Sequence, residues 1–82
     1  MSNPDIFSTI VATDLIPVTP DDDADLAKAA RALRVGSGGT LRVTTLAGNV
    51  RNTSVEAGEV LLVAVSRVHA TGTTASDIEA MT

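Results

Sequence analysis

The fold class of this 82-residue chain is decided by residues 40–46, which read TLRVTTL. Apolar Leu41 and Val43 alternate with polar Thr40 and Arg42. Alternation with a period of two, in a segment rich in β-branched residues, is the pattern of a strand that is buried on one face. The segment therefore predicts a β-strand that covers a small core.

Short β patterns separated by glycine turns follow this strand. Residues 36–39 and 47–49 predict turns before and after it, and residues 56–59 predict another. The strands that we expect are residues 30–35, 40–46, 50–55, 60–68 and 77–81. The segment 60–68 is the most apolar, so we expect it to be central or covered by a partner, with a bulge near residues 66–67. The fold class is therefore all-β, a small β-sandwich or barrel-like domain of about five short strands.

Residues 1–25 predict an extended acidic N-terminal arm, and residues 26–82 the β-domain. The arm holds all three prolines and six acidic residues but no Lys or Arg. It also holds an apolar patch that is too isolated to form a core of its own, and Phe7 is the only aromatic residue of the chain. We expect this patch to lie in a groove of another subunit or protein. The expected anchors are Ile6, Phe7, Ile10, Val11, Leu15 and Ile16.

The composition limits the function classes. A chain of 82 residues without Cys forms one small domain whose core is marginal, so self-association or docking on a partner is expected. The net charge of −4 argues against direct nucleic-acid binding. No apolar run approaches the roughly 20 residues of a membrane span, and the acidic N-terminus does not resemble a secretory signal.

No catalytic, cofactor or metal site is predicted. The glycine run 36–39 lacks the Gly-Lys-Ser/Thr ending of a phosphate-binding loop, and the acids of 21–25 lack the EF-hand spacing. Ser66 and His69 would fall on opposite faces of a strand, so they do not form a triad. We therefore expect a protein that is not an enzyme and has no cofactor.

Two sets of residues are candidates for protein contacts. Basic residues could form a docking face for acidic arms or for another acidic protein surface, with ordinary solvated charge as the alternative; they are Arg31, Arg34, Arg42 and Arg67. Apolar strand residues are candidates for the core or for an oligomer interface; they are Leu41, Val43, Leu61, Val63 and Val65.

Several segments resemble one protein family. They are residues 18–22 (VTPDD), 30–39 (ARALRVGSGG), 41–45 (LRVTT), 55–61 (VEAGEVL) and 67–78 (RVHATGTTASDI). Together they are similar to the head-spike base proteins of bacterial gene transfer agents and related tailed phages and prophages. Local propensity alone favours a helix over residues 21–34. The resemblance instead implies a strand at 30–35 and at most a helical turn near 21–27.

The resemblance implies a virion structural protein on the capsid exterior, assembled in the bacterial host cytoplasm. Such a protein would form a homo-oligomer, a pentamer rather than a trimer, and would contact the major capsid protein and a spike or fibre protein. One alternative is a cement protein between capsomers. The other is a stand-alone β module for a partner or carbohydrate, although the absence of Trp and Tyr argues against sugar binding.

Overall fold

The computed structural model describes residue 12 and residues 14–82 of the chain. In these residues it has seven β-strands and no helix, so the expected all-β class is confirmed. The strands are β1 (Leu15–Pro17), β2 (Ala32–Ser37), β3 (Gly39–Thr45), β4 (Val50–Val55), β5 (Val60–Leu61), β6 (Val65–Val68) and β7 (Ser76–Met81).

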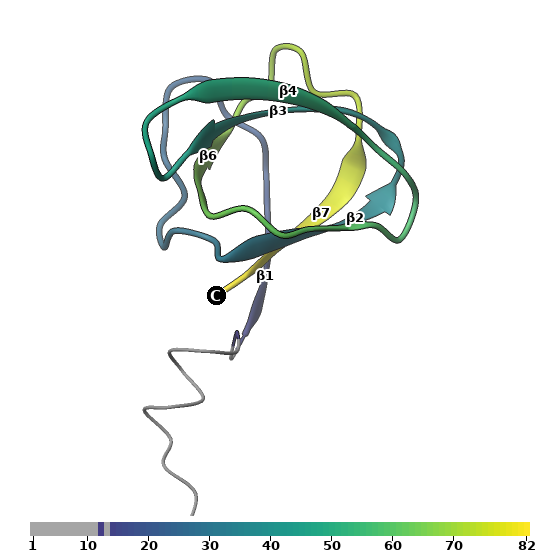
Figure 1. Cartoon of the computed structure of the whole chain (residues 1–82), viewed down its shortest axis with the longest axis horizontal. Helices are drawn as coiled ribbons and strands as arrows, with labels where there is room; N and C mark the ends of the chain where they lie inside the picture. The colour runs from purple at the N-terminus through teal and green to yellow at the C-terminus, as the bar shows by residue number, and fades with distance from the viewer. Residues whose placement is uncertain (1–11, 13) are drawn as a thin grey trace, which may run out of the picture.

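The strands form two antiparallel sheets that pack face to face (Figure 1). Sheet A has the strand order β1-β7-β2-β5, and sheet B has the order β4-β3-β6. The inward positions alternate with polar outward positions, as a two-layer sandwich requires. The largest fully buried side chains come from both sheets; they are Leu33, Leu41, Val35, Val43, Val65 and Val68.

Three of the expected strands are confirmed with small shifts of their ends. Residues 40–46 form β3, residues 50–55 form β4 at the edge of sheet B, and residues 77–81 form β7. The expected strand at 30–35 is present as β2, which begins at Ala32. β7 pairs with both β1 and β2, so the C-terminal strand lies inside sheet A.

The prediction of one strand over 60–68 is wrong. β5 pairs with β2 in sheet A, whereas β6 pairs with β3 in sheet B, and residues 62–64 cross between the two sheets. The continuous apolar run contains no alternation that could have marked this crossing. The bulge expected near residues 66–67 is confirmed: Thr44 pairs with Arg67 and Thr45 pairs with Val65, so Ser66 is the extra residue on β6.

No helical turn forms near residues 21–27, where at most one was expected, because the backbone amides of Asp21 and Leu26 bond to β6 and the Asp23 amide bonds only to the Asp21 side chain. We call residues 18–28 the strap. The Asp21 amide donates to the Val68 carbonyl and the Leu26 amide donates to the Ser66 carbonyl, each at 2.9 Å. The strap thus runs from β1 in sheet A to β6 in sheet B and returns to β2. The described part of the acidic arm therefore lies on its own β-domain.

Candidate interaction surfaces

One end of the sandwich exposes large apolar side chains; we call it the apolar end. It is formed by the β3–β4 turn, the 62–64 crossing and the neighbouring ends of β1 and β7. Leu62 is 82% exposed and Leu46 is 63% exposed. The Leu46 amide donates to the Ala64 carbonyl at 2.9 Å, which holds the turn beside the crossing.

Other exposed apolar side chains lie at the same end; they are Leu15, Val50 and Val63. Leu62 is exposed because it lies on the crossing between sheets, where no strand covers it. Clustered exposed apolar surface on a small domain marks an interaction site more often than scattered residues do. The apolar end is therefore the strongest candidate interface of the described residues.

The opposite end, which we call the polar end, is closed by tight backbone packing. It consists of the β2–β3 link at Gly38, the 56–59 turn and the 69–75 loop, and none of these carries an exposed large hydrophobic side chain. A Cβ added at Gly38 would lie 2.9 Å from the Val55 carbonyl oxygen. A Cβ at Gly39 would lie 2.8 Å from the Ala75 nitrogen. Gly38 and Gly39 thus allow the neighbouring backbone at Val55 and Ala75 to approach closely.

This packing corrects the expectation of a flexible turn at 36–39. Only Gly38 lies between β2 and β3, and the other residues of the run belong to the strands. The Thr40 amide donates to Thr74 Oγ1 at 2.8 Å, and the Thr74 amide donates to the Thr40 carbonyl at 2.8 Å. The end is therefore occupied by protein backbone.

Two acids of the strap bond to the β-domain of the same subunit. Asp22 accepts hydrogen bonds from the Thr71 hydroxyl at 2.6 Å and the Thr71 amide at 2.9 Å, and these two bonds lower the pKa of the Asp22 carboxyl. Arg67 Nε donates to Asp25 Oδ1 at 2.9 Å, and Arg67 Nη1 donates to the Asp22 carbonyl at 2.9 Å. Two acids of the predicted arm are thus held within the subunit.

His69 lies behind this contact. Its Nδ1 is 3.8 Å from Asp22 Oδ1, and its Nε2 is 2.8 Å from Thr44 Oγ1. The imidazole is mostly buried and links the strap to the outer face of sheet B. This placement fits a structural side chain, and the residues around it include no acid–base pair aimed at an open cavity.

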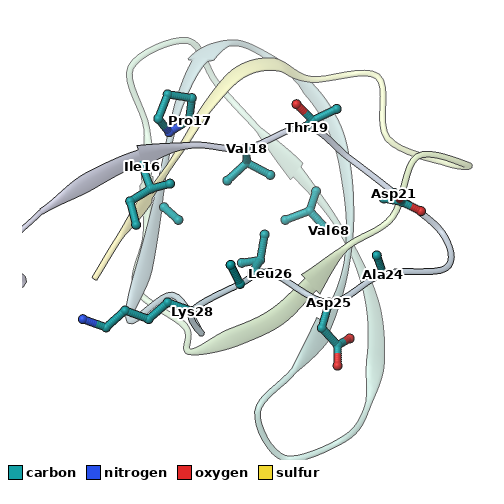
Figure 2. A pocket seen from close by; sticks show the side chains of 12 residues that line it. Ile16, Pro17, Val18, Thr19, Asp21, Ala24, Asp25, Leu26, Lys28 and Val68 are labelled. Atoms are coloured by element: carbon teal, nitrogen blue, oxygen red, sulfur yellow. The ribbon is translucent and has the colours of Figure 1, made fainter.

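A cavity of about 310 Å³ lies between the strap and the sheets. Figure 2 shows Val18, Leu26 and Val68 converging on its interior, whereas Asp25 and Lys28 point away. Val18 and Leu26 also pack against the main core. The cavity has an apolar interior without converging polar groups, so it offers no arrangement for acid–base or metal chemistry.

The four arginines of the expected basic face are distributed over both sheets. Arg34 in β2 alternates with buried core residues of sheet A and forms an ion pair with Glu79 at 3.0 Å. Arg42 in β3 and Arg67 in β6 belong to sheet B, and Arg67 is occupied by the strap. Arg31 directly precedes β2. The structure therefore does not gather the four residues on one sheet.

The residues expected in the core or at an oligomer interface fall into two groups, one in the core and one at the apolar end. Leu41, Val43 and Val65 are buried in the core of the single subunit, and Leu61 packs against this core. Val63 is at the apolar end. Leu46 and Leu62, the most exposed residues of that end, are absent from the expected set because the sequence does not show that residues 62–64 leave the sheet.

The anchor residues expected in the arm are only partly visible. Leu15 and Ile16 lie in β1 with exposed side chains. Ile6, Phe7, Ile10 and Val11 lie outside the described residues. The part of the arm on which the anchoring hypothesis mainly depends is thus known from sequence alone.

Searches for metal and membrane features gave negative results for the described residues. Between residue 14 and residue 82, no three His, Asp or Glu side chains come together as a metal site. In the same part of the chain, no helix has the length and apolarity needed to cross a membrane.

Comparison with known proteins gives one informative match. No protein-family model and no curated protein matches the chain. Among solved structures, a chain of the structure described as "Capsid of native GTA particle computed with C5 symmetry" is 40% identical, where GTA denotes gene transfer agent. The match covers 89% of this chain and 94% of that chain, with a TM-score of 0.76. At this identity and coverage, the chain belongs to the family of that gene transfer agent capsid-particle protein.

Proposed function

We propose that this protein is a virion structural protein that acts as a capsid-attached head-spike base. It forms a homo-oligomer on the capsid exterior and holds a spike or fibre. The observation that carries the proposal is the 40% identity, over nearly the whole of both chains, to a component of a gene transfer agent capsid structure. Its role is assembly and not catalysis.

The exposed apolar end supports the oligomeric part of the proposal. A subunit of this size has a small core, and Leu46 and Leu62 remain in solvent when it is alone. Burying such side chains against another protein surface is favourable by about 25 cal/mol for each Å² removed from water. Assembly would therefore cover surface that the isolated fold leaves open.

A ring of five copies is favoured over a trimer. The particle of the related structure was computed with C5 symmetry, so it has a five-fold axis around which identical subunits can close a ring. The same symmetry also permits positions away from the axis. The pentamer therefore rests on this symmetry together with the resemblance to spike base proteins.

The partners that follow are other copies of this chain, the major capsid protein and a spike or fibre protein. Two kinds of surface on the subunit are available to them. The apolar end provides surface for close subunit or capsid contact, and the polar outer faces of the sheets provide surface for reversible contacts. Neither nucleic acid nor a membrane is a partner in this proposal.

A cement role between capsomers is the second candidate. It is compatible with the same match, since the related chain is described only as part of a capsid structure. The two candidates differ in position on the particle, because a spike base sits at a vertex and a cement protein sits between capsomers.

Electron microscopy of purified particles tests the proposal. Particles with the intact gene are compared with particles from which the gene for this chain is deleted. We expect the deletion to remove density at the vertices together with the attached spikes, while the capsid shell stays closed. Loss of density between capsomers would favour the cement role, and unchanged particles would contradict both.

A further inference from the structure

We infer that the apolar end is the receptor for residues 6–11 of a neighbouring copy of this chain. The inference rests on the proposed homo-oligomer and names the surfaces that join its subunits. The receptor is formed by Leu46, Leu62 and Val63, and the ligand is an apolar extended segment that carries the only aromatic residue of the chain.

The N-terminal segment joins the fold at the apolar end. β1 pairs with β7 so that Leu15 lies opposite Met81, and the Thr82 amide donates to the Asp14 carbonyl at 3.0 Å. Asp14 therefore lies opposite Thr82, the residue after β7, at the apolar end. The N-terminal segment thus joins the described fold at the end where the exposed leucines are also found.

The composition of the segment before Asp14 is typical of extended backbone. Residues 8–13 read STIVAT and contain neither Gly nor Pro. Their β-branched residues favour extended backbone, and Ser8 is the only residue of the usual tight-turn types among them. We therefore expect the segment not to reverse onto its own domain, so that its apolar residues are available to another copy.

Reach and chemistry are compatible with this partner. Seven extended residue steps separate Phe7 from Asp14, which corresponds to about 23 Å. The segment 6–11 offers Ile6, Phe7, Ile10 and Val11 and has no charged residue. The receptor is likewise apolar, so contact removes apolar surface from water on both sides without burying an unpaired charge.

Disulfide trapping tests the inference cleanly because the chain has no cysteine. Phe7→Cys protein is mixed with Leu62→Cys protein, co-assembled under reducing conditions and then oxidised. A bond between two single-cysteine variants can form only between different chains, and only when their Cα atoms approach within about 7 Å. The matched control replaces Leu62→Cys by Glu56→Cys, which places an exposed cysteine at the polar end.

We expect the Phe7–Leu62 pair to give at least tenfold more covalent dimer than the Phe7–Glu56 pair. Equal yields would overturn the inference. The double variant Phe7→Cys/Leu62→Cys provides a second reading: a bond formed within one chain at high dilution, with none between mixed single variants, would show that the segment folds back onto its own domain and would also overturn it.

Substitution gives an independent measurement. Leu62→Asp should weaken subunit association at least tenfold, whereas Val60→Asp, the same change at an exposed position within β5, should not. Equal effects would contradict the assigned receptor. Light scattering distinguishes failure of this inference from failure of the proposed homo-oligomer. If the protein is an oligomer but the Phe7–Leu62 disulfide does not form, only this inference is contradicted. If the protein is a monomer at all concentrations, the proposed homo-oligomer is contradicted as well.

Discussion

The two ends of the sandwich differ in what covers them. At the polar end, glycines let backbone segments approach so closely that an added Cβ would clash, and threonine hydroxyls satisfy the amides. At the apolar end, leucines are left in solvent beside the point where the N-terminal segment leaves. The fold thus closes one end from within the subunit and leaves apolar side chains exposed at the other.

The largest expected effect compares two leucines. Leu41→Ala removes a fully buried side chain and should lower the free energy of unfolding by about 3–5 kcal/mol. Leu62→Ala removes an exposed one, so its effect on the same quantity should be below about 0.5 kcal/mol, measured on the dissociated subunit. Urea unfolding at concentrations below assembly measures both. A large decrease in the free energy of unfolding on Leu62→Ala would show that Leu62 belongs to the core of the subunit.

A second comparison uses two glycines. Gly39→Ala at the polar end places a Cβ 2.8 Å from the Ala75 nitrogen and should destabilise the fold by about 2–3 kcal/mol. Gly48→Ala at the apolar end meets nothing within 4 Å and bears only the strain of a φ of +93°, about 1 kcal/mol. Thermal unfolding should give the Gly39→Ala variant a lower Tm than the Gly48→Ala variant. The reverse order of the two Tm values would contradict the tight packing of the polar end.

The smallest effect concerns pH. Hydrogen bonds from Thr71 lower the pKa of the Asp22 carboxyl in the folded protein. A lowered pKa in the folded state stabilises the protein at pH values above the ordinary Asp pKa of about 3.9, and this gain is lost as the pH falls through the lowered value. The Asp22→Asn variant should therefore have a lower free energy of unfolding than the wild type at pH 7. This difference in unfolding free energy should become smaller as the pH falls. A constant gap down to pH 2 would indicate that the carboxylate charge has no role.

The strands with clear alternation could be predicted from sequence, and the crossings between sheets could not. β3 has a strict apolar–polar alternation, so its existence and its inward face follow from the sequence alone. The apolar run at 60–65 has no such period, and its division between two sheets depends on tertiary pairing with β2 and β3. The exposure of Leu62, the most exposed of the large apolar residues in the described structure, therefore could not be predicted from the sequence.

The strap shows the same limit. Residues 21–34 have good local helix signals, but the amides of Asp21 and Leu26 pair with β6 and the side chains of Asp22 and Asp25 bond to Thr71 and Arg67. These partners lie 40 to 49 positions away in the sequence. Local propensity cannot anticipate such contacts, and tertiary bonding overrides it here. Asp22 and Asp25 are therefore held within the subunit.

Hydrogen–deuterium exchange tests the contrast between the two ends most directly. The assembled protein is compared with the same protein diluted until it is monomeric. We predict that assembly slows exchange in peptides covering residues 46–48 and 62–64 and leaves exchange at residues 57–58 and 70–73 unchanged. Protection confined to the polar end, with no change at 62–64, would contradict it.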